Sequence, residues 1–199
     1  MPDTKKPSST IGFKDVVIAP LTSDTEAGVE YGEIMPVVGA IEATITPENS
    51  EPDVQYADDG EYDVVYPDPE LTFTTRMADI PLDIQQIIFG SKVDANGVLL
   101  RNANDKPPYF AIGFKSEKAD HTFRYVWLFK VRAKPMTENY NSKEGETITR
   151  QTPEVEWTAI KRNYDANYQA VADEGINGFT AEKAKTFLST VYEPVSAST

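Results

Sequence analysis

Several residue types on which enzyme sites depend are missing or nearly so. The 199-residue chain has no cysteine and a single histidine, His121. The absence of cysteine excludes disulfides, thiolate metal sites and cysteine nucleophiles. One histidine removes most metal and general-base arrangements, and we expect His121 to be a solvated residue in a turn. The common motifs of hydrolases, nucleotide-binding enzymes and zinc proteases are also absent.

Long apolar runs are missing as well. No stretch approaches the roughly 18 apolar residues of a membrane-spanning helix, which predicts no contact with a membrane. The first ten residues are polar and lack the apolar core of an export signal. We expect flexible ends at residues 1–10 and 195–199, flanking one domain at 11–194. Nine Phe, ten Tyr and two Trp suffice for a core in that domain.

Basic residues are absent from one long stretch. Between Asp15 and Thr75 there are fifteen carboxylates and no Lys or Arg, whereas the remaining residues carry 17 acids and 19 bases. The net charge of -13 is therefore a property of this stretch. A pI near 4.5 argues against general attraction to nucleic acid. Such a block is typical of a disordered tail or of a surface that faces a partner.

Alternating side chains within this stretch predict a folded ribbon. Residues 37–46 and 68–77 read as two strands, joined by a long acidic loop at 47–69. Ile41, Ala43 and Ile45 are predicted to share one apolar face with the odd-numbered residues of the second strand. The opposite face is small, polar and acidic, and it comprises Glu42, Thr44, Thr46, Glu70, Thr72 and Thr74. Long ordered loops tend to be functional, so we expect the same of 47–69.

The rest of the chain predicts a mainly β protein. Further strands are expected at 11–20, 109–115, 123–134 and 154–161, with a loop or hairpin tip at 23–32 and a loop at 163–178. In the strand at 123–134, Trp127, Phe129 and Val131 are predicted to share one face. One internal helix is expected at 80–90, where Pro81 suits the start and Gly90 the end, and a C-terminal helix at 181–192. Together, these elements predict an antiparallel β-sandwich or barrel-like fold with a long acidic hairpin loop.

Three specific site hypotheses are weak. A glycoside hydrolase needs two carboxylates, but the acidic stretch favours no particular pair. The run Asp58-Asp59-Gly60-Glu61 offers oxygen ligands for Ca²⁺ without matching an EF-hand, and a hairpin tip is favoured. Trp127 suits a sugar-binding platform, although an aromatic stripe on a strand is typical of core. We therefore predict no catalytic, cofactor-binding or metal-binding residues.

An ordered set of segments nevertheless resembles a known family. The set includes Ile11-Gly-Phe-Lys-Asp-Val-Val-Ile-Ala-Pro20, Tyr56-Ala-Asp-Asp-Gly60, Ile80-Pro81-Leu82-Asp83, Val93-Asp-Ala-Asn-Gly-Val98, Asp105-Lys-Pro-Pro-Tyr109, Arg124-Tyr-Val-Trp-Leu-Phe-Lys130 and Val191-Tyr-Glu-Pro194. Together they resemble the major tail proteins, or tail tube proteins, of bacteriophages with long non-contractile tails. That family is similar to other phage tail tube proteins and to the tube protein of type VI secretion systems. The resemblance covers about residues 11–194.

The resemblance implies a structural virion protein with no catalytic residues and no cofactor. Six copies would form a ring, and stacked rings would form the tube through which DNA is ejected without specific binding. Other copies, the tape measure protein and the tail tip and terminator proteins are the implied partners, with assembly in the host cytoplasm. The alternative is a β-sandwich module of the virion that binds a receptor or glycan, which would need exposed aromatic residues near loops.

Two hypotheses about named residues follow. We expect the polar face of the predicted ribbon to line the channel, since small and acidic side chains give DNA phosphate nothing to bind. We expect the acidic loop to contact a neighbouring subunit through Glu48, Glu51, Asp53, Asp58, Asp59, Glu61 and Asp63. Basic residues elsewhere are candidates to pair with this loop across subunits, namely Lys115, Lys118, Arg124, Lys130, Arg132 and Lys134.

Overall fold

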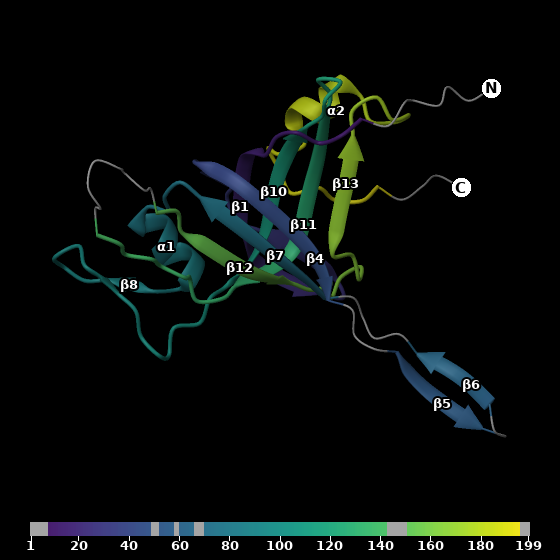
Figure 1. The fold of residues 1–199 in the computed structure, drawn as a ribbon, viewed down its shortest axis with the longest axis horizontal. Helices are drawn as coiled ribbons and strands as arrows, with labels where there is room; N and C mark the ends of the chain where they lie inside the picture. Colours follow the sequence, from purple (N-terminus) through teal and green to yellow (C-terminus); the bar gives the residue numbers. More distant parts are fainter. Residues whose placement is uncertain (1–7, 49–51, 58–59, 66–69, 143–150, 196–199) are drawn as a thin grey trace.

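One large antiparallel sheet organises the protein. The computed structural model describes residues 8–48, 52–57, 60–65, 70–142 and 151–195 (Figure 1). Nine strands form the sheet in the order β2-β1-β10-β11-β12-β7-β4, with β3 paired to β1 and β13 paired to β11. Their bounds are β1 (Lys14–Thr25), β2 (Gly28–Tyr31), β3 (Met35–Val37), β4 (Ala40–Glu48), β7 (Glu70–Met77), β10 (Tyr109–Glu117), β11 (Phe123–Ala133), β12 (Glu154–Ala159) and β13 (Gln169–Asp173).

Four further strands and two helices complete the described fold. Strands β5 (Asp53–Ala57) and β6 (Gly60–Val65) pair with each other, as do β8 (Lys92–Val93) and β9 (Leu99–Leu100). The helices are α1 (Leu82–Phe89) and α2 (Ala181–Thr186). No helix in the described part of the chain has the length and apolar character that a bilayer span requires.

The sheet divides into two layers because β11 has two partners along one edge. Residues 124–128 of β11 pair with β13, whereas residues 131–133 pair with β12. The branch that runs through β12, β7 and β4 therefore diverges from β13 and packs against the rest of the sheet (Figure 1). Phe73 of β7 stacks on Phe114 of β10, with the ring centroids 5.7 Å apart. This layered, mainly β architecture confirms the predicted fold class.

Strands β10 and β11 are buried on both faces. Phe110, Ile112 and Leu128 belong to a first core that β7, β12 and α1 cover. Ala111 and Trp127 belong to a second core, which α2 and the segment after it cover. Because successive side chains of a strand point to opposite faces, two buried faces explain why these strands are nearly continuously apolar.

A β-bulge in β11 changes which core its side chains enter. Phe110 pairs with Val131 but Ile112 pairs with Leu128, so β11 has one residue more than β10 over this interval. Trp127 and Phe129 lie in the second core, while Val131 lies in the first. The predicted alternation that put Val131 on the face of Trp127 is therefore wrong, because a bulge resets the two-residue period.

Helix α1 matches its prediction. It follows Pro81, buries Gln85, Ile88 and Phe89, and ends at Gly90, which adopts the left-handed conformation with φ 65°. A Cβ at Gly90 would lie 2.6 Å from the carbonyl oxygen of Lys106, so both the backbone conformation and the close approach require glycine.

Helix α2 is shorter than predicted. Thr180 caps it as expected, accepting a hydrogen bond from the backbone N–H of Lys183. The helix ends at Thr186 and not at residue 192. The carbonyl of Phe187 accepts a 2.9 Å hydrogen bond from the indole N–H of Trp127, and Phe187 packs on Tyr192. These tertiary contacts replace the continuation of the helix.

The hairpin tip predicted at 23–32 is present, whereas two predicted loops contain strands. The segment 23–32 is a tight hairpin between β1 and β2, and the segment 163–178 contains β13. The segment 47–69 carries its own hairpin of β5 and β6, called the acidic hairpin below, which projects away from the main sheet (Figure 1). Of the predicted flexible ends, residues 1–7 and 196–199 lie outside the described residues, whereas Ser9 and Thr10 pair with the turn at 118–119.

Candidate functional site

The outer face of β4, β7 and β12 is polar and solvent-exposed. Cross-strand pairs join Thr44 to Thr74 and Thr46 to Thr72. The side chains between them, such as Phe73, point into the first core. All six residues predicted for one polar face lie on this surface, where Thr72 and Thr74 are half-buried and the others exposed. Strand β12 adds Glu154, Glu156 and Thr158 opposite Arg76, Thr74 and Thr72. We call these residues of the three strands the polar sheet face.

One residue of β4 departs from the predicted pattern. The pairing register shifts between Ala40 and Glu42, which leaves Ile41 as an extra residue. Ala40, Ala43 and Ile45 pack against the first core, but the side chain of Ile41 is 49% exposed. The prediction that Ile41 shares the apolar face is therefore wrong, again because a bulge interrupts the alternation.

The polar sheet face carries more carboxylates than bases, and its bases are held in place. Arg76 forms ion pairs with Glu42 at 3.1 Å and with Glu154 at 3.0 Å. Lys134, just after β11, pairs with Glu156, and this hydrogen bond raises the pKa of Lys134. The remaining acids of the face are Glu48, which accepts a hydrogen bond from Thr72, and Glu70.

Strand β4 forms an open edge of the sheet. Among the described strands it is hydrogen-bonded to β7 alone, so the N–H and C=O groups of its other side face outward. Pro47 lies in β4, a position that an edge strand tolerates because proline cannot donate to a ladder. An open edge of nine residues is a template for pairing with another chain.

The acidic hairpin interleaves apolar and acidic residues, and a register shift between Gln55 and Tyr56 leaves Tyr62 as an extra residue. Val54 pairs directly with Val64, and Gln55 pairs with Asp63 on the opposite face. Tyr56 and Tyr62 are exposed. Of the acids predicted to contact a neighbouring subunit, Glu48 lies at the end of β4 and Asp63 lies in β6. Asp53 belongs to β5 and Glu61 to β6, and only the backbone of these two residues is described. Glu51, Asp58 and Asp59 lie outside the described residues.

Most of the basic residues proposed as partners of this hairpin pair within their own chain. Ion pairs join Lys115 to Asp15, Lys118 and Arg124 to Asp173, Lys130 to Asp24 and Lys134 to Glu156. The guanidinium of Arg132 lies 3.8 Å from the ring centroid of Tyr109. These pairings explain the placement of the basic residues without another subunit, so the hypothesis that they bind the acidic hairpin loses its support.

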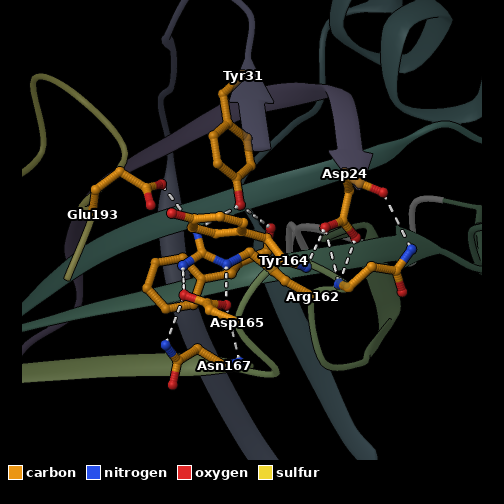
Figure 2. Close-up of polar contacts among 9 residues, drawn as sticks. Asp24, Tyr31, Arg162, Tyr164, Asp165, Asn167 and Glu193 are labelled. Atoms are coloured by element: carbon orange, nitrogen blue, oxygen red, sulfur yellow. Dashed lines mark hydrogen bonds and ion pairs between the residues drawn. The ribbon is translucent and has the colours of Figure 1, made fainter. Parts of the chain in front are cut away.

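A buried cluster around Arg162 was not predicted. The Arg162 side chain is 0% exposed and pairs with Asp165 in bidentate geometry, while a third nitrogen donates to Glu193 at 2.9 Å (Figure 2). Its guanidinium carbon lies 4.1 Å from the ring centroid of Phe129. A guanidinium nitrogen of Arg162 also donates a 3.4 Å hydrogen bond to the hydroxyl oxygen of Tyr31. Nothing in the sequence distinguishes Arg162 from the other basic residues, because two of its partners, Tyr31 and Glu193, are distant along the chain.

Burial and charge together set the ionisation of this cluster. Burial raises the pKa of Tyr31 to about 12 despite its contact with Arg162. Burial also opposes the charged forms of Arg162 and Asp165, but their mutual hydrogen bonds outweigh it, so the pKa of Arg162 lies above its usual value and that of Asp165 below. Beside them, Asp24 accepts hydrogen bonds from the backbone N–H groups of Asn163 and Tyr164 (Figure 2). The cluster therefore holds permanent charges and joins distant segments.

The hypothesis of a sugar-binding platform at Trp127 finds no support in this geometry. Trp127 is 0% exposed and Trp157 is buried with its indole N–H on Thr75, so neither is available as a sugar-binding platform. Within the described residues, no group of His, Asp or Glu side chains is arranged to hold a metal ion. His121 is exposed in its turn, as predicted, with φ 63°.

Comparison with known proteins identifies a family for the chain. No curated protein matches the chain. A family model described as phage tail tube protein matches residues 25–199, which include the polar sheet face, the acidic hairpin and Arg162. This match confirms the resemblance seen in the sequence, and the family is structural and not enzymatic. Because it covers well over half of the chain, the chain belongs to the phage tail tube protein family, whose members are virion components that self-assemble into a tube.

Proposed function

We propose that six copies of this chain form a closed ring, and that stacked rings form the conduit through which phage DNA is ejected. The open edge of β4, next to the polar sheet face, carries the proposal. Cyclic assembly brings one surface of each copy against a different surface of the next. A ring joined at sheet edges satisfies the outward backbone groups of β4 and continues the polar sheet face from copy to copy around a channel.

The chemistry of the polar sheet face suits such a channel. Its threonines are short, and its carboxylates repel the phosphates of DNA. Arg76 and Lys134 are paired with carboxylates of the same face, so they offer little free positive charge to DNA. A channel lined in this way lets DNA pass without specific binding.

The remaining partners belong to the same proposal. The acidic hairpin projects beyond the ends of β4 and β7, where Glu48 pairs with Glu70, and we propose that it contacts a neighbouring copy (Figure 1). The tape measure protein and the tail tip and terminator proteins are the expected partners within the virion. We place the assembly of the tube in the host cytoplasm.

Electron microscopy of the purified protein tests the proposal. We expect tubes or rings with six-fold symmetry in averaged end views, and density for the side chains of Thr44 and Thr74 on the inner wall. Rings of another number would overturn the hexamer, and Thr44 on the outer surface would overturn the channel assignment. A protein that remains monomeric at all concentrations and salt conditions would contradict self-assembly without other tail proteins.

A further inference from the structure

Asparagine precedes glycine at two places in the chain, Asn96-Gly97 and Asn177-Gly178. At such a step the backbone nitrogen of the glycine can attack the side-chain carbonyl carbon of the asparagine, because glycine has no Cβ to shield that nitrogen. The nitrogen loses its proton and bonds to the carbon, and the side-chain nitrogen leaves as ammonia. Water then opens the succinimide ring to aspartate or isoaspartate. A neutral side chain thus becomes a carboxylate without an enzyme.

Exposure does not distinguish the two steps. Asn96 and Asn177 are both exposed, and both glycines adopt positive φ angles, 78° at Gly97 and 91° at Gly178. No atom of the described residues lies within 4 Å of a Cβ at either glycine. Any difference in reactivity must therefore come from the contacts that hold the reacting atoms.

The step at Asn96 is held by hydrogen bonds. The backbone N–H of Gly97, which is the attacking group, donates to the carbonyl oxygen of Asp94 at 3.0 Å. The carboxylate of Asp94 accepts from the side-chain amide of Asn96 at 3.3 Å and from the backbone N–H of Val98 at 2.9 Å. Attack would break the turn, and the nearby carboxylate disfavours the negative charge that develops on the nitrogen of Gly97.

The step at Asn177 has neither restraint. Its turn is closed one residue later, where the backbone N–H of Phe179 donates to the carbonyl oxygen of Ile176 at 3.1 Å. In the described part of the chain, no group accepts a hydrogen bond from the backbone N–H of Gly178, and the side chain of Asn177 has no partner. The ammonium of Lys183 donates to the carbonyl oxygen of Gly178 at 2.8 Å. A positive charge so close favours the deprotonated nitrogen.

We propose that Asn177 is a site of spontaneous deamidation in the folded protein, and that the fold protects Asn96 from the same reaction. Two identical dipeptides differ because one turn uses the glycine N–H in its closing hydrogen bond and the other leaves it available. The modification requires only water and no partner, so it is independent of tube assembly.

Isoaspartate in place of Asn177 would disturb the second core. It lengthens the backbone by one methylene group in the turn just before Thr180, the N-cap of α2. The ring of Phe179, within the same turn, packs on Tyr125 and Phe187 with centroid distances of 5.6 Å and 5.3 Å. A longer turn cannot keep both its hydrogen bond and these ring contacts without strain. We therefore expect the modified protein to unfold at a lower temperature.

Ageing of the full chain at mildly alkaline pH tests the proposal, since hydroxide removes the amide proton. Peptide mass spectrometry would follow Asn177 and Asn96 in the folded protein and, in parallel, in protein unfolded by urea. We expect conversion at Asn177 to be at least several-fold faster than at Asn96 in the folded protein, and the two rates to become similar in urea. Equal rates in the folded protein, faster conversion at Asn96, or a preference that persists unchanged in urea would each overturn the proposal.

A matched pair of variants separates the two sites. Glutamine closes the corresponding ring slowly because its side chain is one methylene longer. Asn177→Gln should therefore slow the appearance of the acidic form that ion-exchange chromatography resolves in the aged parent, whereas Asn96→Gln should age like the parent. Ageing should lower the unfolding temperature of the parent and leave that of Asn177→Gln unchanged. An acidic form that appears equally fast in Asn177→Gln would contradict the assignment, and an aged parent with unchanged unfolding would contradict the link to the second core.

Discussion

Arg162 shows how a single buried charge can join distant parts of this protein. Its guanidinium contacts Tyr31 of β2, Asp165 in the following loop and Glu193 near the C-terminus (Figure 2). Removing water from a charged side chain is costly, and the paired carboxylates together with the Phe129 ring offset that cost. Removal of the arginine would leave the half-buried carboxylate of Asp165 without its charged partner.

We expect Arg162→Met to lower the free energy of unfolding by about 3–5 kcal/mol, the range for breaking a buried ion pair. The matched control is Arg76→Met, which breaks the exposed pairs with Glu42 and Glu154 and should cost less than about 1 kcal/mol. Urea unfolding of the monomer, followed by tryptophan fluorescence, measures both. Equal effects of the two substitutions would show that the cluster is not the stabilising contact that we infer.

Because the carboxylate of Asp173 is paired, we expect the protein to lose stability in acid. Hydrogen bonds from Arg124, and then from Lys118, hold the pKa of this carboxyl well below its usual value, although burial opposes them. A carboxyl whose pKa is depressed by folding stabilises the protein fully above its unfolded pKa, about 3.9. That contribution is lost as the pH falls through the lower, folded pKa.

The substitution Asp173→Asn should therefore destabilise the protein at pH 7, and the difference from the parent should shrink as the pH falls below about 4. Unfolding curves of both proteins at a series of pH values measure this difference. A constant difference between neutral and acid pH would mean that Asp173 acts through packing and not through its charge.

The indole ring of Trp127 in β11 covers Gly113, its cross-strand partner in β10. Gly113 of β10 is paired with Trp127 of β11, and a Cβ at Gly113 would lie 2.8 Å from three atoms of the indole ring. The ring is fully buried and its N–H is held by the carbonyl of Phe187, so it cannot move aside freely. Glycine is therefore required here by the space that the indole occupies.

We expect Gly113→Ala to cost about 1–3 kcal/mol, the range for overpacking a core. Gly28→Ala in β2 is the control, because no atom lies within 4 Å of a Cβ at that position, and its effect should stay within about 0.5 kcal/mol. Thermal unfolding of the monomers compares the two. A neutral Gly113→Ala would show that the indole shifts at little cost.

The charge of the polar sheet face matters more in the assembled tube than in the isolated chain. Each side chain on the polar sheet face would be repeated in every copy of a ring, so one added base becomes a circle of bases. Arg76 and Lys134 are neutralised by ion pairs with carboxylates of that face, whereas Arg132, opposite Thr158, stacks on the ring of Tyr109. We therefore expect the interaction of the channel with DNA to be sensitive to single substitutions that leave the fold unchanged.

We expect Thr44→Lys to leave tube assembly intact and to slow DNA ejection several-fold, because unpaired lysines in the channel would bind phosphate. Thr190→Lys is the control, since Thr190 is exposed beyond α2 and away from the polar sheet face. Ejection kinetics of phage particles built with each variant provide the measurement. Equal ejection by the two variants would contradict the placement of Thr44 in the channel.

Local periodicity, which depends on neighbouring residues alone, was enough to predict much of this protein. The alternation in β7 correctly separated Phe73 from Thr72 and Thr74, and Pro81 with Gly90 correctly bounded α1. The ordered set of segments was enough to identify the family. The placement of the six polar residues on one exposed face also followed from alternation, although their role in a channel stays a prediction.

The local sequence pattern did not predict features that depend on residues far apart in the chain. The bulges at Ile41 and near Phe129 arise from the register of the neighbouring strand, and each moves side chains to another face. Helix α2 stops where Trp127, 60 residues away in sequence, takes the carbonyl of Phe187. Arg162 is buried because Tyr31, 131 residues away, packs beside it. The sequence thus specified strands, faces and family, while register, bulges and buried charge pairs were settled when the layers packed together, because they depend on contacts between residues far apart in the chain.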